Sequence, residues 1–310
     1  MMNQPAPMRL VFVATGDIAV PAFRQLLEHG PRPLALVTQP DKPVGRHQTL
    51  QPPTLKLEAL KAGIPVLQPA VIGEVAGELA AMAPDVIVVM AYGQILRQEM
   101  LALAGTAIIN LHASLLPRHR GASCIQAAIA AGDAATGITA MHVTRALDAG
   151  DVICCQAIRL AAQETGGGLH DRLAELAPEV LAAALHGLAT GTATRTPQDA
   201  ALVTYAPKLE REAGRIDWAL DALTLERRIR AYDPWPGTFT VVREAGQPRR
   251  LKIFPPVEVC HCELGPGEFA AEEGILRVGC GAAALRLHEV QLEGSRRMSA
   301  AEYLRGRQSG

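Results

Sequence analysis

Between residues 8 and about 188, short runs of β-branched apolar residues alternate with stretches rich in alanine and leucine. This alternation is typical of a Rossmann-like, mostly parallel sheet with helices on both faces, because parallel strands need crossovers that helices usually supply. The run Val86–Met90 has no polar alternation, as expected of a strand buried on both faces. We expect strands at residues 10–14, 34–38, 86–90, 107–111, 138–143 and 152–158.

Beyond residue 206 the pattern changes to short strand-like runs separated by glycine and proline. Runs at residues 238–242, 251–254, 274–278 and 284–287 predict a small C-terminal β-barrel, OB-like in type. The preceding stretch is short of large apolar residues and carries Gly, Thr and Pro, which is typical of a linker. We therefore predict an α/β domain over residues 1–188, a linker over 189–206 and a β-barrel domain over 207–310.

Composition limits where the chain works and what it binds. No run of about 18 apolar residues is present, so we expect no membrane contact, and the N-terminal apolar run is too short for a signal peptide, which favours the cytoplasm. The six cysteines form no CxxC pair. Cys260-His261-Cys262 lacks a second ligand pair, so we predict reduced thiols and no metal. The net charge of −1 gives no global sign of a nucleic-acid binder, and any RNA site must be a local patch.

Asn110 and His112 lie at the end of an expected strand. The two-residue period of a strand puts both side chains on one face, at the sheet edge where open α/β sheets bind ligands. An amide can donate to a developing oxyanion, and an imidazole with a pKa of about 6.5 exchanges protons near neutrality. Taken alone, the pair favours a structural role, in which the two side chains satisfy backbone groups at a strand end.

A second polar cluster, Asp148-Ala149-Gly150-Asp151, precedes another expected strand. Asp148 can accept a hydrogen bond from His112, which would raise the pKa of the imidazole and fix its orientation. Spacing alone favours another role for both aspartates, an Asx-type turn before the strand, and it does not show that Asp148 meets His112.

The first cluster resembles the signature of the folate-dependent formyltransferases, because Asn110-Leu111-His112 is followed by Ser114-Leu115-Leu116-Pro117, Arg118, Arg120 and Gly121. Asp148-Ala149-Gly150-Asp151 is similar to that family's second motif. The resemblance implies a catalytic trio and 10-formyltetrahydrofolate as formyl donor, with no metal. The implied catalytic residues are Asn110, His112 and Asp148, and the implied folate-binding residues are Ser114, Leu115, Leu116, Pro117, Met90, Tyr92 and Gly93.

The implied formyl acceptor comes from a different segment. Residues 39–46 resemble the tRNA-contacting loop of methionyl-tRNA formyltransferases, which implies that Lys42 and Arg46 bind tRNA. Motifs near residues 204–209, 215–218 and 233–237 are similar to those that lead into that family's C-terminal domain. The resemblance thus implies formyl transfer to the amino group of methionyl initiator tRNA, for translation initiation, with residues 207–310 holding tRNA. Charged initiator tRNA and the folate donor are the expected partners, with no obligate protein partner.

Three other functions compete with this interpretation. A folate-dependent formyltransferase acting on an amino-sugar nucleotide shares the trio and a Pro-Trp-Pro-Gly segment, but the loop at residues 39–46 argues against it. A nicotinamide dehydrogenase is disfavoured because no GxGxxG follows the first strand. The intact trio argues against a non-catalytic folate-binding or RNA-binding module.

Overall fold

The computed structural model describes residues 8–44, 48–96, 98–244 and 246–308 of the 310-residue chain. These residues form two compact units. The first unit comprises Met1–Cys124, Thr136–Ile158 and His170–Pro207, and the second comprises Ile125–Ala135, Arg159–Leu169 and Lys208–Gly310. Two short segments that precede residue 170 therefore belong to the unit that the C-terminal residues form.

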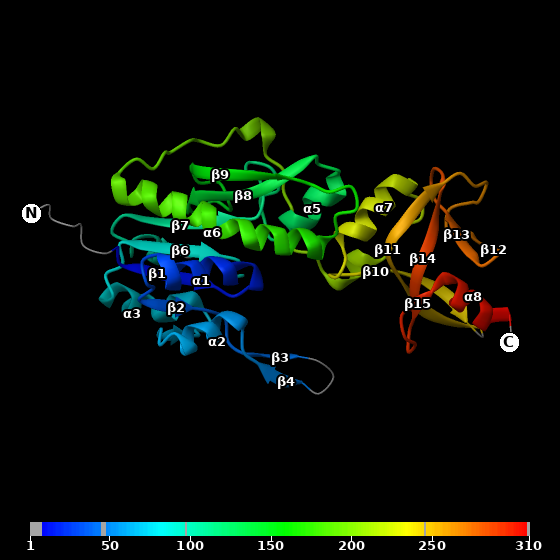
Figure 1. The fold of residues 1–310 in the computed structure, drawn as a ribbon, viewed down its shortest axis with the longest axis horizontal. Helices are drawn as coiled ribbons and strands as arrows, with labels where there is room; N and C mark the ends of the chain where they lie inside the picture. The colour runs from blue at the N-terminus through cyan, green and yellow to red at the C-terminus, as the bar shows by residue number, and fades with distance from the viewer. Residues whose placement is uncertain (1–7, 45–47, 97, 245, 309–310) are drawn as a thin grey trace, which may run out of the picture. The chain divides into compact units, whose positions relative to one another are not determined.

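A seven-stranded sheet with the order β5-β2-β1-β6-β7-β8-β9 forms the core of the first unit (Figure 1). Its strands are β1 (Leu10–Ala14), β2 (Ala35–Val37), β5 (Val66–Leu67), β6 (Val86–Met90), β7 (Ala107–His112), β8 (Ala135–His142) and β9 (Val152–Arg159). Neighbouring strands from β5 to β7 pair in parallel, and β8 runs antiparallel to β7. This confirms the expected Rossmann-like sheet. The short β5 was missed, because two residues show no periodicity.

Alternate residues of β1 bury opposite faces of the sheet. Phe12 contacts Phe23 of helix α1 on one face, with ring centroids 5.4 Å apart. Val11 and Val13 point to the other face, where they join a core with Leu79 of helix α3. A fully buried leucine of this kind stabilises the fold by about 1.5–3 kcal/mol. The helices and 3-10 turns of this part of the chain are η1 (Asp17–Ala19), α1 (Val20–His29), α2 (Thr54–Lys61), η2 (Ile72–Val75), α3 (Ala76–Ala81), α4 (Gln98–Leu101), α5 (Cys124–Ala131) and α6 (Gly166–Thr190).

Residues 39–53, for which the composition predicts a surface loop, form a hairpin in part. Strand β3 (Lys42–Val44) pairs antiparallel with β4 (Thr49–Gln51). The expectation of an irregular loop was wrong here, because both strands are short and β4 is exposed along its length, so neither shows a hydrophobic alternation. The carboxylate of Asp41 fixes the base of the hairpin, accepting hydrogen bonds from Lys56 Nζ and Gln68 Nε2, both at 2.8 Å.

The stretch between α6 and residue 207 contains one short 3-10 turn, η3 (Ala200–Leu202). Its flanks pair with the first unit through isolated bridges, Val152 with Thr196 and Arg120 with Tyr205. The stretch that the composition marks as a linker is thus attached to the first unit up to Pro207.

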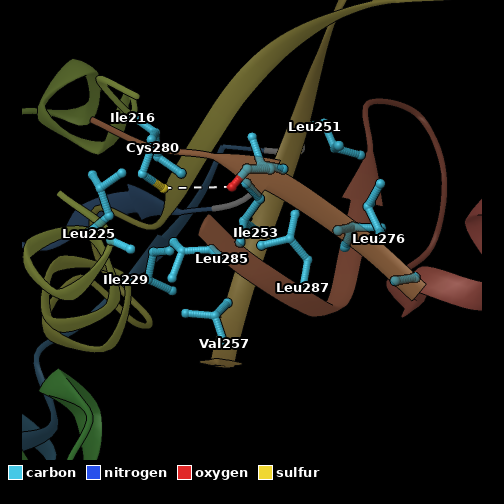
Figure 2. Packing of buried hydrophobic residues seen from close by; sticks show 14 of the residues in the cluster. Ile216, Leu225, Ile229, Leu251, Ile253, Val257, Leu276, Cys280, Leu285 and Leu287 are labelled. Carbon is cyan, nitrogen blue, oxygen red and sulfur yellow. Dashed lines mark hydrogen bonds between the residues drawn. The ribbon is translucent and has the colours of Figure 1, made fainter. Parts of the chain in front are cut away.

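The second unit contains an antiparallel, curled half-barrel sheet with the order β10-β11-β14-β13-β12, and β15 pairs with β14. The expected OB-like C-terminal domain is confirmed. Figure 2 shows Leu225 and Ile229 of helix α7 packed against Ile253 and Val257 of β11. The elements are η4 (Arg211–Gly214), α7 (Ala222–Ala231), β10 (Thr238–Glu244), β11 (Gln247–Cys260), β12 (Phe269–Glu272), β13 (Ile275–Gly279), β14 (Ala284–Leu292), β15 (Met298–Ser299) and α8 (Ala300–Gln308).

Three further findings concern the cysteines, metal-binding groups and helices of the described residues. All six cysteines are free thiols, and burial raises the pKa of Cys280, whose Sγ lies 3.7 Å from the Val278 carbonyl, to about 11 (Figure 2). Within the described ranges, no group of three or more His, Cys, Asp or Glu side chains is arranged to hold a metal ion. None of the helices described has the length and apolar character needed to cross a membrane.

Candidate functional site

The carboxyl ends of β6 and β7 meet at one edge of the sheet, since Val89 pairs with Asn110 in parallel register (Figure 1). Asn110 and His112 lie on the same face of β7, as the two-residue period predicts. Asn110 is half-buried and His112 is buried. Within the described part of the chain, the Asn110 carboxamide forms no hydrogen bond, so its N–H donors remain available to a ligand at this edge.

His112 lies between two oxygen atoms. Its Nε2 is 2.9 Å from the His119 carbonyl oxygen, and its Nδ1 is 3.7 Å from Asp148 Oδ2. The first distance is a hydrogen bond in which the ring donates, and the second is too long for one but close enough for an ion pair. Two oxygens facing the two ring nitrogens suit the protonated imidazole, which is a donor at both positions.

The charge state of His112 follows from its surroundings. Burial lowers the pKa of the imidazole, but the neighbouring Cys124 thiol, the Asp148 carboxylate and the His119 carbonyl together raise it to about 9. The ring is therefore positively charged at neutral pH. Sequence reasoning did not find Cys124, because a cysteine at the start of a helix carries no signal for a contact with a strand residue.

Backbone and side-chain hydrogen bonds fix the loop after β7. Ser114 Oγ donates to the Arg118 carbonyl at 2.7 Å, and Thr139 Oγ1 donates to the Ser114 carbonyl at 2.6 Å. His119 has a φ of 58° and Gly121 a φ of 114°, both in the region that favours glycine. A Cβ atom on Gly121 would lie 2.5 Å from the Ala206 carbonyl oxygen, so glycine is required there.

Asp148 is joined to this loop, because its Oδ2 accepts a hydrogen bond from the Gly121 N–H at 2.8 Å. The residue has a φ of 47°, a conformation that is uncommon outside glycine but tolerated by aspartate. Two positions further on, a Cβ atom on Gly150 would lie 1.7 Å from the His142 carbonyl oxygen. The Asp-Ala-Gly sequence therefore allows the loop to pass close to β8 and present its carboxylate to His112.

The expected folate-binding residues are not equivalent in exposure. The side chains of Met90, Tyr92 and Ser114 are buried, and burial raises the pKa of Tyr92 to about 12. The exposed residue among them is Gly93, which has a φ of 84°. The Leu115, Leu116 and Pro117 side chains are half-buried. The half-buried side chains and the Gly93 backbone are thus the accessible groups of this set.

Of the two expected tRNA-binding residues, Lys42 lies on the hairpin. Lys42 is exposed on β3 and its Nζ donates to Gln39 Oε1. Gln39 Nε2 in turn donates to the Tyr92 carbonyl at 2.6 Å, which connects the hairpin base to the segment that follows β6. Arg46 lies outside the described residues.

The turn after β1 is supported by the segment that follows β6. The N–H groups of Thr15 and Gly16 donate to the Ala91 carbonyl at 3.3 and 3.0 Å. This turn is therefore held against the segment that follows β6.

Comparison with protein families matches both parts of the chain. Residues 8–185 match the formyl transferase family, and residues 208–308 match the formyl transferase C-terminal domain. The chain is 52% identical over 305 residues to a methionyl-tRNA formyltransferase of Akkermansia muciniphila, covering 96% of each chain. It is 41% identical to a methionyl-tRNA formyltransferase of Geobacter metallireducens, covering 97% of this chain and 96% of the relative.

Solved structures share the fold at low sequence identity. An N-formyltransferase from Helicobacter canadensis, in complex with folinic acid and dTDP-3-aminofucose, has a TM-score of 0.67 at 15% identity, covering 94% of this chain and 100% of that chain. HypX from Aquifex aeolicus, in complex with tetrahydrofolic acid, has a TM-score of 0.64 at 20% identity, covering 96% of this chain and 47% of that chain. These two similarities establish the fold.

Proposed function

Because the chain belongs to the formyl transferase family, among the methionyl-tRNA formyltransferases, we propose that Asn110, His112 and Asp148 carry out its reaction. The enzyme transfers a formyl group from 10-formyltetrahydrofolate to the amino group of methionyl initiator tRNA. The observation that carries the proposal for the trio is the placement of His112, 3.7 Å from Asp148 and on the same strand face as Asn110.

The trio supplies what an acyl transfer to an amine needs. Attack of the amine on the formyl carbon places negative charge on the formyl oxygen, and the carboxamide of Asn110 donates to it. The positive charge of His112, held by Asp148, stabilises the same oxyanion. The departing folate nitrogen needs a proton and the amine loses one. His112, which begins as the imidazolium, donates its proton to the folate nitrogen and then accepts the proton that the amine loses.

We assign the folate-holding roles from the exposure of the residues expected to bind folate. Leu115, Leu116, Pro117 and the backbone of Gly93 hold the folate, which supplies the formyl carbon. Lys42 and Arg46 contact the acceptor end of the tRNA, and residues 207–310 form a tRNA-binding domain. Since an aminoacylated tRNA is the substrate, we infer that the enzyme works in the cytoplasm, where translation takes place.

The trio is tested by substitution of Asn110. Asn110→Asp keeps the side-chain shape but removes the N–H donors, and Asn110→Ala removes the group. We expect both to lower the turnover of charged initiator tRNA by about 100-fold or more, with folate binding retained. The measurement is transfer of a labelled formyl group, with free methionine and an amino-sugar nucleotide as alternative acceptors. Near-normal turnover by either folded variant would remove Asn110 from the mechanism.

A further inference from the structure

The segment 196–206, which we call the arm, packs against the two catalytic loops, which are the loop after His112 and the turn at Asp148. Thr196 and Val152 exchange backbone hydrogen bonds of 2.8 and 3.1 Å. At the other end, the Arg120 N–H donates to the Thr204 carbonyl at 2.9 Å and the Ala206 N–H donates to the Arg120 carbonyl at 2.7 Å. The arm is thus attached at both ends to the segments that carry His112 and Asp148.

Both the nitrogen and the oxygen of the Gln198 carboxamide form hydrogen bonds with the catalytic loops. Its Nε2 donates to the carbonyl oxygens of Asp148 and Gly150, at 2.9 and 2.8 Å. Its Oε1 accepts from Arg120 Nη2 at 2.7 Å and from Arg120 Nε at 3.1 Å. One side chain therefore ties the Asp148 turn, in its left-handed backbone conformation, to the loop that follows His112.

Thr204 holds the opposite side of His112. Its Oγ1 accepts a hydrogen bond from the His119 N–H at 2.8 Å and lies 3.4 Å from His119 Nδ1. The carbonyl of the same His119 accepts the hydrogen bond from His112 Nε2. His119 also has a left-handed backbone conformation, which neighbouring contacts must maintain.

We propose that Gln198 and Thr204 are positioning residues for formyl transfer, which hold Asp148 and the His119 carbonyl against the two nitrogens of His112. The inference rests on the proposed role of the trio. In this role Gln198 acts through the backbone of Asp148, and Thr204 acts through the backbone of His119. When a holding contact is lost, the imidazole is free to rotate away from its productive orientation. A displacement of about 1 Å at a catalytic group can lower turnover by about 100-fold.

The test uses full-length variants with matched controls. Thr204→Val keeps the shape of the side chain and removes its hydroxyl, whereas Thr204→Ser keeps the hydroxyl. Gln198→Ala removes the tie to Asp148. The controls are Thr192→Val and Asp199→Ala, exposed residues near or within the same segment whose side-chain contacts are to Thr190 and Ala201 rather than to the trio. Each variant is assayed for kcat, for KM of both substrates, for the pH dependence of kcat and for its melting temperature.

We expect Thr204→Val and Gln198→Ala to lower kcat by about 10-fold to 100-fold while KM for folate and tRNA changes less than about twofold. In the unsubstituted enzyme we expect kcat to fall at alkaline pH as His112 loses its proton. In Thr204→Val and Gln198→Ala this fall should occur at lower pH, because His112 loses part of the contact with His119 or Asp148. Thr204→Ser should restore most of the turnover, and both controls should match the unsubstituted enzyme.

Three results would overturn the inference: an unchanged kcat in folded Thr204→Val and Gln198→Ala, a loss confined to KM, or a Thr204→Ser variant as impaired as Thr204→Val. The two Asn110 variants separate this failure from that of the proposed function. If those variants lose turnover while Thr204→Val and Gln198→Ala keep it, the trio stands and the positioning role is wrong. If they keep turnover, the trio itself is wrong.

Discussion

At the scale of single residues, His112 combines burial with positive charge. An isolated buried imidazole would lose its proton, because burial favours the neutral form. Here the Cys124 thiol, the Asp148 carboxylate and the His119 carbonyl outweigh that effect. These three groups at the end of β7 therefore keep the His112 imidazole positively charged.

The pH dependence of turnover should follow this charge. The pKa of His112 is raised to about 9, so the imidazolium is present at neutral pH and is lost as the pH rises through about 9. We expect kcat to fall over that interval. Cys124→Ala removes one of the groups that raise the pKa, so its fall should begin at lower pH. Titration of the His112 ring by NMR checks the assignment, and the exposed Cys155→Ala is the matched control. If kcat of Cys124→Ala falls at the same alkaline pH as that of the unsubstituted enzyme, Cys124 does not act on His112.

At the scale of elements, the β3-β4 hairpin is held at its base by a few polar side chains. Lys56 of α2 lies 2.8 Å from Asp41, and Gln68 Nε2 donates both to Asp41 Oδ1 and to the Gln39 carbonyl. The hairpin strands themselves contribute little burial, because β4 is fully exposed. The orientation of the hairpin therefore depends on these contacts at its base.

Lys56→Ala should weaken tRNA binding without affecting the chemistry. Loss of the Lys56 contact with Asp41 loosens the hairpin that carries Lys42, so we expect KM for charged tRNA to rise several-fold while kcat and the KM for folate stay close to normal. Lys61→Ala, at the exposed end of the same helix, is the matched control and should leave all three constants unchanged. An equal rise in the KM for tRNA in both variants would mean that the loss of one positive charge, and not the orientation of the hairpin, weakens tRNA binding.

The sequence predicts the elements of this fold where local patterns are strong. The uninterrupted apolar run of β6 and the paired polar residues of β7 both lie where the periodicity places them. The hairpin was missed because its short strands carry no apolar face. The composition of the arm predicted a linker, and its contacts with the catalytic loops were not foreseen. Gln198 and Thr204 meet partners 78 and 85 residues earlier in the chain, and such long-range pairings leave no trace in local composition.

At the scale of the whole molecule, the second unit is built from three separate stretches of chain. Arg230 of α7 illustrates how they are joined. It donates to Glu226 within its own helix, with Nη2 2.9 Å from Oε2, and through Nη1 to the Glu164 carbonyl at 2.8 Å. All three residues are buried, so the arginine connects Arg159–Leu169 to the C-terminal part of the unit.

Arg230→Ala should destabilise the protein by about 3–5 kcal/mol, because it leaves Glu226 buried and without its partner. Chemical denaturation followed by circular dichroism measures the loss. Arg228→Ala, on the same helix, removes a half-buried side chain that lies over the Tyr232 ring at 5.4 Å and should cost less than about 1 kcal/mol. Equal losses of unfolding free energy in the two variants would mean that the buried Arg230–Glu226 pair contributes no more to stability than the Arg228 side chain.

The interleaving of the two units also sets an order of events during synthesis. A nascent chain leaves the ribosome from its N-terminus, and domains generally fold as they emerge. Here Ile125–Ala135 and Arg159–Leu169 emerge long before the C-terminal stretch that they join, and Gln198 and Thr204 emerge after all three residues of the trio. A ribosome-bound chain that stops before residue 198 contains Asn110, His112 and Asp148 but lacks Gln198 and Thr204, the side chains that we propose hold Asp148 and the His119 carbonyl against His112. On that proposal, full catalytic competence arises late in translation, when the last residues of the first unit are released.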